Sequence, residues 1–165
     1  MTAFDEEIYK SASALVEMLT ERRMSVATAE SCTGGTLAGA ITDVAGSSAV
    51  FGYGIVSYAN EAKMKLLGVK EETLCSHGAV SRETAIEMAA GVRELSGADF
   101  GLSTTGIAGP GGAVPGKPVG TVWCAISSKD GTEAYLLNLS GERAEVRAQT
   151  VEFLLKKLIC KIQDK

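Results

Sequence analysis

Histidine is nearly absent from this chain of 165 residues, since His77 is the only one. A metal site built from several histidines is therefore excluded, and any serine–histidine–aspartate triad would have to use His77. This residue lies in the stretch 75–79, which we predict to be a loop, and we expect it to be structural or exposed rather than catalytic. We predict no metal and no cofactor.

Long apolar runs and clustered cysteines are also missing. No stretch approaches the roughly 18 apolar residues that span a bilayer, so we expect no membrane segment. The cysteines lie far apart and form no CxxC pair, which excludes a zinc knuckle and argues against a disulfide framework; they are Cys32, Cys75, Cys124 and Cys160. The acidic start MTAFDEEIYK is unlike a signal or transit peptide, so we expect a reducing cytoplasm.

Basic residues are too few and too scattered for a nucleic-acid surface. The formal net charge is −4, and the lysines and arginines form no stripe along the chain. Because nucleic-acid affinity depends on clustered positive charge, we expect no nucleic-acid partner.

Aromatic residues make up only 5% of the chain, whereas glycine occurs 19 times. A core of small and aliphatic residues, interrupted by many turns, is typical of α/β layering. Periodicity and capping residues predict helices over 5–22, 36–43, 61–67, 82–96 and 142–162, and strands over 24–29, 49–58, 100–105, 119–127 and 133–139. We therefore expect a single domain over 1–165, an α/β fold with a three-layer α/β/α sandwich and a mixed, mostly parallel sheet of about five strands.

The first candidate for chemistry is the turn Glu30-Ser31-Cys32-Thr33-Gly34-Gly35, which joins a strand to a helix. Such a turn exposes a side chain at the carboxyl edge of the sheet and points backbone N–H groups outward, where they can hold an oxyanion. Ser31 is the candidate nucleophile. Alternatively, Ser31 or Thr33 is only a helix N-cap. The Cys32 thiol ranks below Ser31, because no histidine partner is evident.

The second candidate is Lys63. If Asn60 caps the helix 61–67, Lys63 falls in its first turn, where the helix dipole and partial burial lower the lysine pKa. A neutral lysine can accept a proton from a serine, as in serine–lysine hydrolases. The alternative is a solvated lysine paired with a nearby glutamate.

The third candidate is the loop over 106–118, which contains five glycines and three prolines. Gly111 to Lys117 satisfies the G-x-x-x-x-G-K part of a P-loop, but Pro118 has no hydroxyl for magnesium and a strand follows, so we reject a Walker A site. The loop is still suited to lining a pocket for phosphate or sugar, with the hydroxyl of Thr105 beside it. A plain surface loop is the alternative.

The fourth candidate is the pair Arg143 and Arg147, which share one face in the first turns of the last helix. Cations at that end work against the helix dipole, and a bound anion such as a phosphate is one reason to place them there. Pairing with Glu142 or Glu145 is an equally good explanation.

Together these segments resemble the CinA C-terminal domain family, whose characterised members are nicotinamide-nucleotide amidases. The matching stretches are TAESCTGGTLAGAIT at 28–42, FGYGIVSYANEAKMKLLGV at 51–69, GAVSRETAIEMA at 78–89, STTGIAGPGG at 103–112 and GTVWCAIS at 120–127, with GERAEVRAQT at 141–150 as a looser match. The resemblance covers nearly the whole chain, and the pairing of the ESCTGG and TGIAGPGG blocks is specific.

The resemblance implies a homodimer that hydrolyses the carboxamide of nicotinamide mononucleotide to nicotinate mononucleotide and ammonia, in pyridine nucleotide recycling. It also implies that Ser31 is the nucleophile and Lys63 its base, assisted by Tyr58 and Thr105. The substrate-binding positions that it implies are Cys32, Thr33, Gly34, Gly35, Gly106, Gly109, Gly111, Arg143 and Arg147. Longer relatives carry a further N-terminal domain that looks like a nucleotide pyrophosphatase, so we expect only the amidase activity here.

Two other hypotheses stay open at the level of sequence. One is an amidase that uses Cys32 on the same substrate. The other is a non-enzymatic nucleotide-binding or adaptor module linked to competence and DNA damage, which would bind a nucleotide without releasing ammonia.

Overall fold

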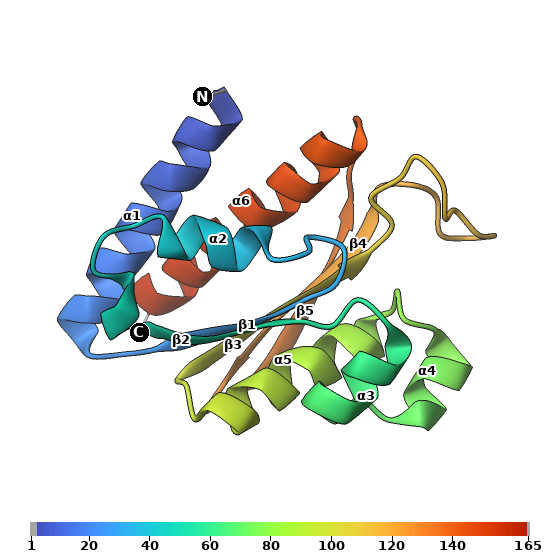
Figure 1. Cartoon of the computed structure of the whole chain (residues 1–165), viewed down its shortest axis with the longest axis horizontal. Helices are drawn as coiled ribbons and strands as arrows, with labels where there is room; N and C mark the ends of the chain where they lie inside the picture. Colours follow the sequence, from blue (N-terminus) through green and yellow to red (C-terminus); the bar gives the residue numbers. More distant parts are fainter. Residues whose placement is uncertain (1–2, 165) are drawn as a thin grey trace.

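The computed structural model describes residues 3–164 of the chain, and Figure 1 shows a sheet with helices on both faces. The helices are α1 (Ala3–Arg22), α2 (Thr36–Thr42), α3 (Asn60–Leu67), α4 (Glu71–His77), α5 (Arg82–Ser96) and α6 (Arg143–Gln163), with a short 3-10 helix η1 (Ser47–Ala49). The strands are β1 (Val26–Glu30), β2 (Phe51–Val56), β3 (Phe100–Gly106), β4 (Thr121–Ser128) and β5 (Gly131–Asn138).

The sheet has five strands in the order β2-β1-β3-β4-β5. β1 pairs in parallel with β2 and β3, and β4 pairs antiparallel with β3 and β5. Four of the five strands therefore run in the same direction, and only β4 opposes them. The predicted α/β/α sandwich on a mixed five-stranded sheet is confirmed.

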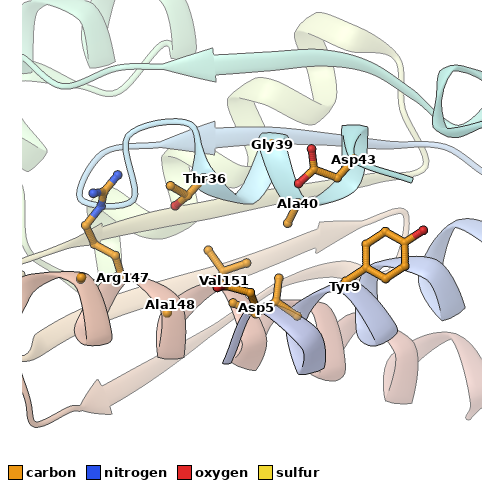
Figure 2. A pocket seen from close by; sticks show the side chains of 11 residues that line it. Asp5, Tyr9, Thr36, Gly39, Ala40, Asp43, Arg147, Ala148 and Val151 are labelled. Atoms are coloured by element: carbon orange, nitrogen blue, oxygen red, sulfur yellow. The ribbon is translucent and has the colours of Figure 1, made fainter. Parts of the chain in front are cut away.

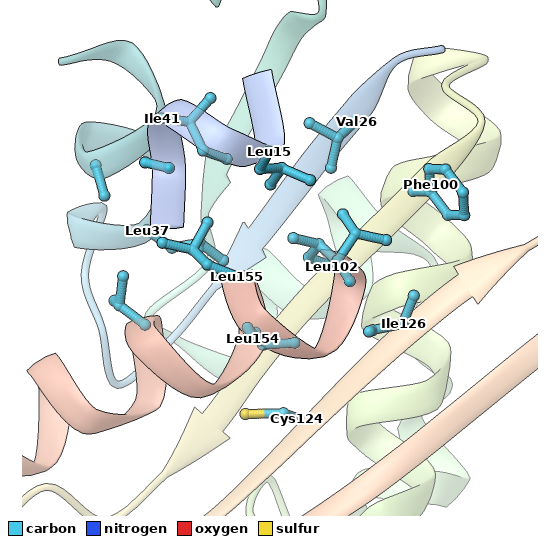
Figure 3. Close-up of a cluster of buried hydrophobic side chains, with 14 of the residues drawn as sticks. Leu15, Val26, Leu37, Ile41, Phe100, Leu102, Cys124, Ile126, Leu154 and Leu155 are labelled. Atoms are coloured by element: carbon cyan, nitrogen blue, oxygen red, sulfur yellow. The ribbon is translucent and has the colours of Figure 1, made fainter. Parts of the chain in front are cut away.

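Two apolar layers hold the helices on the sheet. α1, α2 and α6 cover one face, and α3 and α5 cover the other (Figure 1). Along each strand, successive side chains point alternately to the two faces of the sheet. In β3, Leu102 joins the core under α1, α2 and α6 (Figure 3), whereas the Ser103 hydroxyl donates to the carbonyl of Ala85 in α5. Within the described residues, no helix is both long enough and apolar enough to cross a membrane.

Two local predictions are wrong. Residues 75–79 are not simply a loop, because His77 ends helix α4, which the sequence pattern did not reveal. The carboxylate of Glu87 in α5 fixes the start of α4 by accepting hydrogen bonds from the Lys70 N–H and the Thr73 hydroxyl, and such a tertiary contact leaves no periodic signal. Asn60 does not cap α3 either. It is the first helical residue, and the N-cap position is Ala59, which makes no side-chain capping bond.

The order of the elements places three chain segments at one edge of the sheet. β1, β2 and β3 run in parallel, so their carboxyl ends meet there. The chain leaves β1 toward α2 on one face and leaves β2 toward α3 on the other face, as Figure 1 shows. In α/β sheets, ligands bind in the crevice that such a divergence opens at the carboxyl edge.

Candidate active site

Ser31 and Lys63 meet at this carboxyl edge. Ser31 follows β1 directly, and the Nζ atom of Lys63 lies 3.1 Å from its Oγ atom. The same Nζ lies 2.7 Å from the carbonyl oxygen of Ser57 and 3.3 Å from that of Tyr58. The lysine side chain is 1% exposed, so it is one of the largest fully buried side chains in the described chain.

The surroundings of Lys63 favour its neutral form. Burial lowers the pKa of the amine below its ordinary value of 10.5, because a charged group loses its hydration there. A neutral amine has two hydrogens and one lone pair, and two carbonyl acceptors plus one hydroxyl match that set. Nζ donates to the carbonyl oxygens of Ser57 and Tyr58, and its third contact is the hydroxyl of Ser31, which faces the lone pair whenever the amine is neutral. With a side chain that is 1% exposed, Lys63 is not solvated. The alternative of a solvated lysine paired with a glutamate is therefore wrong.

The position of Lys63 in α3 explains its reach. α3 begins at Asn60, so Lys63 lies in the first turn of the helix. Side chains of a helix point back toward its N-terminus, and this direction carries the amine past the residues that link β2 to α3 and onto the end of β1. Its contact with Ser31 spans 32 residues of sequence.

Glu30 organises the turn that carries Ser31, and sequence reasoning gave this residue no role. The side chain is 0% exposed. Its Oε2 atom accepts hydrogen bonds from the Thr33 hydroxyl (2.6 Å) and from the N–H groups of Gly35 (3.1 Å) and Leu37 (3.0 Å). Its Oε1 atom accepts from the N–H of Ala38 (2.8 Å). One feature of the sequence could have pointed to Glu30: it is a glutamate at the end of a buried strand, just before the turn into a helix.

These bonds restrict which backbone groups can hold an oxyanion. The N–H groups of Gly34 and Gly35 are occupied by the Ser31 carbonyl and by Glu30. The predicted set over 32–35 therefore reduces to Cys32 and Thr33, whose N–H groups donate to no backbone carbonyl among residues 3–164. Both glycines have a positive φ, 59° and 99°, which allows the chain to reverse sharply after the nucleophile.

The thiol of Cys32 is a poor nucleophile in this setting. It is 5% exposed and its side chain contacts the hydroxyl of Thr104. Burial raises the pKa of the thiol to about 11, so the thiolate that cysteine chemistry requires is scarce at neutral pH.

A cavity of about 180 Å³ lies beside the nucleophile turn at the carboxyl edge, and its lining includes Cys32 and Tyr58, the neighbours of Ser31 and Ser57 in sequence. Its walls come from the nucleophile turn, the β2–α3 link, the glycine loop and the start of α6, and they include Cys32, Tyr58, Gly106, Gly109, Gly111 and Arg143. Arg143 joins two of these walls, because its guanidinium donates to the carbonyl of Gly109 (2.9 Å) and to the hydroxyl of Tyr58 (3.0 Å). The structure therefore brings together the glycine loop, Tyr58 and Arg143.

Close packing explains two of the glycines in the stretch 106–118. A Cβ at Gly109 would lie 2.6 Å from a methyl group of Val119, and one at Gly106 would lie 2.7 Å from a methyl group of Val122. Gly111 is different, since a Cβ there would meet no atom within 4 Å.

Arg147 lies apart from Arg143. Its guanidinium donates to the carbonyl of Thr33 (2.8 Å), so it ties α6 to the nucleophile turn. Figure 2 shows it at one end of a groove of about 410 Å³ between α1, α2 and α6, with Tyr9 at the other end. Neither arginine pairs with Glu142 or Glu145 in the described structure, because these glutamates form a reciprocal capping box at the start of α6.

Thr105 does not reach the cavity. It is 1% exposed, and its hydroxyl donates to the carbonyl of Ala79 on the α5 side of the sheet. The neighbouring Thr104 points to the opposite face and lies 2.7 Å from the Thr33 hydroxyl. The prediction that Thr105 offers its hydroxyl to a ligand is corrected accordingly, since adjacent residues of a strand face opposite sides.

No metal-binding cluster accompanies these residues. Within the part of the chain that the structure describes, no group of three or more histidine, cysteine, aspartate or glutamate side chains is arranged to hold a metal ion. His77 is exposed, and its Nδ1 lies 3.7 Å from a carboxylate oxygen of Glu83. Ser31, Lys63 and Arg143 lie at the carboxyl edge, and Glu30 lies behind the nucleophile turn.

Comparison with known proteins gives consistent matches. Residues 8–162 match the family model of the CinA C-terminal domain. A solved structure of the competence/damage inducible protein CihA from Agrobacterium tumefaciens superposes with a TM-score of 0.93 at 44% identity, covering 97% of this chain and 98% of that one. A CinA superfamily protein from Escherichia coli gives a TM-score of 0.90 at 36% identity, covering 96% of this chain and 92% of that one.

Longer proteins match as well. A putative competence-damage inducible protein of Thermoanaerobacter sp. (strain X514) is 52% identical over 149 residues, which are 90% of this chain and 36% of that protein. A CinA-like protein of Endomicrobium trichonymphae is 51% identical over 91% of this chain and 36% of its own length. The chain thus spans about a third of the length of the curated relatives that it matches.

Proposed function

The chain belongs to the CinA C-terminal domain family, and from this premise we propose that it is an amidohydrolase that converts nicotinamide mononucleotide to nicotinate mononucleotide and ammonia. The observation that carries the proposal is the buried amine of Lys63, 3.1 Å from the hydroxyl of Ser31 and bound to two carbonyl groups. This geometry is what a serine nucleophile needs when a lysine replaces the histidine of a triad.

In the proposed reaction, the neutral amine of Lys63 takes the proton of the Ser31 hydroxyl as Oγ bonds to the carboxamide carbon. The tetrahedral intermediate then collapses, the C–N bond breaks, and the proton on Lys63 passes to the leaving ammonia. Water next attacks the ester on Ser31 and gives a proton to Lys63. The C–Oγ bond breaks, Oγ recovers the proton, and nicotinate mononucleotide leaves.

The backbone N–H groups of Cys32 and Thr33 are the proposed donors to the oxyanion, because they donate to no backbone carbonyl among the described residues. Such preorganised donors are most effective where water is excluded. The pyridinium ring makes the carboxamide carbon more electrophilic, and its positive charge further disfavours a charged lysine close to it. The uncharged state of Lys63 and the charge of this substrate are therefore compatible.

Arg143 is the proposed contact for the phosphate of the substrate. It is exposed, it lines the cavity, and its described partners are the neutral Gly109 carbonyl and Tyr58 hydroxyl. A guanidinium with neutral partners can still bind a phosphate oxygen strongly through charge-assisted hydrogen bonds. Tyr58, held by Arg143, is placed to line the side of the same cavity.

The test is ammonia release from nicotinamide mononucleotide by the wild-type chain and by Ser31→Ala. We expect the wild type to release ammonia and the variant to lose at least about 10³-fold in kcat, since it lacks the nucleophile, while still binding the nucleotide in calorimetry. A Ser31→Ala variant with the normal rate contradicts the mechanism. Nucleotide binding by the wild type without ammonia release would favour a binding or adaptor module instead.

Cys32→Ala, in the next position of the same turn, separates the serine from the cysteine hypothesis. We expect this variant to keep most of the wild-type kcat, because the buried thiol has its pKa raised to about 11. Loss of activity in Cys32→Ala together with inactivation of the wild type by iodoacetamide would point to the cysteine.

We also propose a homodimer in the cytoplasm. All four cysteines are free thiols, as a reducing compartment maintains them. The surface proposed for pairing is the outer edge of β2, which in the described sheet pairs only with β1. Tyr53 and Val56 on this strand are 48% and 49% exposed, and no charged residue interrupts 51–58.

A further inference from the structure

Glu30 is a buried carboxylate directly before the nucleophile, and the proposed reaction gives it no chemical step. Its exposed fraction is 0%, and within residues 3–164 no lysine or arginine lies within ion-pair distance of it. A buried charge is costly unless hydrogen bonds compensate it. The hydrogen bonds around Glu30 must therefore compensate the burial of a carboxylate next to Ser31.

The donors around Glu30 all come from the turn and from the beginning of α2. They are the Thr33 hydroxyl and the N–H groups of Gly35, Leu37 and Ala38. Three of them point at Oε2 and one points at Oε1. These groups belong to residues 33–38. The Glu30 side chain, at the end of β1, therefore fixes the path of the backbone that follows Ser31.

The hydroxyl groups of Thr33 and Thr104 link Glu30 to the residues that follow the nucleophile. A carboxylate only accepts hydrogen bonds, so the Thr33 hydroxyl donates to Glu30 and accepts from the Thr104 hydroxyl, 2.7 Å away. The Thr104 hydroxyl in turn contacts the thiol of Cys32. Thr33 is thus held by hydrogen bonds to Glu30 and Thr104, and the Cys32 side chain lies against Thr104.

We propose that Glu30 is the positioning residue of the nucleophile turn, which holds Ser31 Oγ against Lys63 and aims the N–H groups of Cys32 and Thr33 at the reacting carbonyl. This inference rests on the proposed serine chemistry. Glu30 acts through the backbone and touches neither Ser31 Oγ nor Lys63. The requirement is for an acceptor at both carboxylate oxygens, because an amide in the same place would direct its NH₂ group at a backbone N–H.

Glu30→Gln tests this requirement with almost no change in shape. We expect kcat for ammonia release to fall about 100-fold with KM within a factor of about three, because a misplaced nucleophile slows the reaction more than it weakens binding. The pH at which the rate is half-maximal should stay where it is in the wild type, since Glu30 does not contact Lys63. Thr33→Val, which removes one donor to Glu30, should show the same pattern with about a tenfold loss.

A second readout does not depend on the substrate. A fluorophosphonate probe reacts when Ser31 Oγ bonds to phosphorus, fluoride leaves and Lys63 takes the hydroxyl proton; peptide mass spectrometry then measures labelling at Ser31. We expect Glu30→Gln to slow labelling by a factor similar to its loss in kcat. Leu158→Ala, in the core far from the turn, is the matched control for lowered stability, and it should label at the wild-type rate below its melting temperature.

The outcomes separate the two proposals. If the wild type labels at Ser31 but releases no ammonia from nicotinamide mononucleotide, the substrate assignment fails and Glu30 is judged on labelling alone. The inference is overturned if Glu30→Gln keeps the wild-type kcat or labelling rate, if its losses equal those of Leu158→Ala, or if its pH midpoint shifts. It is overturned as well if wild-type Ser31 does not label, because no activated nucleophile then exists to be positioned.

Discussion

The charge of Lys63 controls the proposed reaction, and this gives it a defined dependence on pH. Only the neutral amine can accept the Ser31 proton, and burial lowers the Lys63 pKa below 10.5. We therefore expect kcat to rise as the pH rises through this lowered pKa and then to level off. Measurement of kcat from neutral to alkaline pH at saturating nicotinamide mononucleotide checks this.

Lys63→Arg is the variant that isolates the role of the neutral form. A guanidinium stays charged at every pH used, so we expect a loss of about 10³-fold with no recovery at alkaline pH. An active Lys63→Arg enzyme, or a wild-type rate that does not change with pH, would exclude Lys63 as the base.

The same shift links Lys63 to stability. Because the pKa of Lys63 is lower in the folded than in the unfolded chain, the unfolded chain binds more protons in the interval between the two values. The free energy of unfolding should therefore rise with pH across that interval, and this contribution is lost as the pH falls through the folded pKa. Urea unfolding at several pH values measures this slope, which Lys63→Met should remove.

At the residue scale, the sequence predicted where the candidate residues lie better than it predicted the residues that support them. Ser31, Lys63, Tyr58 and Arg143 share the carboxyl edge, where a turn after a strand and a lysine in a first helical turn were visible in the sequence. The role of Glu30 was not visible, since its donors lie up to eight residues ahead and meet it only in the folded turn.

For Arg147 and Thr105, the spacing of residues in the sequence was not enough to predict what their side chains contact. Spacing places Arg147 on the same helix face as Arg143, yet it contacts the Thr33 carbonyl rather than the cavity. Spacing also places Thr105 at the end of its strand but does not tell which face of the sheet it occupies. Both assignments depend on packing between elements that are distant in sequence.

At the scale of elements, Gly91 connects the position of α3 to the rest of the fold. It lies in α5, and a Cβ there would be 1.9 Å from the carbonyl oxygen of Leu67 at the end of α3. Gly91→Ala must therefore change the packing between α5 and α3, and α3 carries Lys63. We expect the free energy of unfolding to fall by about 1–3 kcal/mol, as overpacking does, and kcat to fall as Lys63 retreats from Ser31. Urea unfolding and ammonia release measure the two effects.

Gly39→Ala is the matched control for this prediction. Gly39 also lies inside a helix, α2, but a Cβ there would meet no atom within 4 Å. Alanine is the better helix former, so we expect this variant to be more stable by about 0.5–1 kcal/mol and to keep its activity. If Gly91→Ala matched Gly39→Ala in stability and rate, the contact between α3 and α5 would not fix the site.

Helices with a clear cap or a periodic apolar face could be predicted from the sequence. Helices that depend on contacts with other elements could not. α5 begins at the expected cap, where Ser81 accepts a hydrogen bond from the Thr84 N–H, and α6 buries the expected face of Val151, Leu154, Leu155 and Leu158. α4 has only seven residues and depends on Glu87 in another helix. Asn60 has the composition of a cap but lies one residue inside the helix.

At the scale of the whole molecule, the two edge strands of the sheet differ in how well they are protected against pairing with another chain. The edge strand β5 carries Glu133, which pairs with Lys161 of α6, and charges at an edge discourage pairing with another chain. The edge strand β2 runs FGYGIV without a charge, and its residues 52–54 are exposed. In an antiparallel pair of identical strands around a twofold axis, residues near the middle of the strand, such as Tyr53, lie near their own copies. An uncharged strand therefore suits such pairing.

Tyr53→Lys tests β2 as the dimer surface. Two lysines brought together across the twofold axis repel each other, so we expect the dimer of the wild type to become a monomer at the same micromolar concentration, with unchanged circular dichroism. Light scattering after size exclusion gives the mass. The control is Tyr9→Lys, because Tyr9 is 49% exposed, like Tyr53 at 48%, but lies on α1 beside the groove in Figure 2. A wild-type monomer contradicts the dimer, and a dimer lost in Tyr9→Lys but kept in Tyr53→Lys would move the interface to that groove.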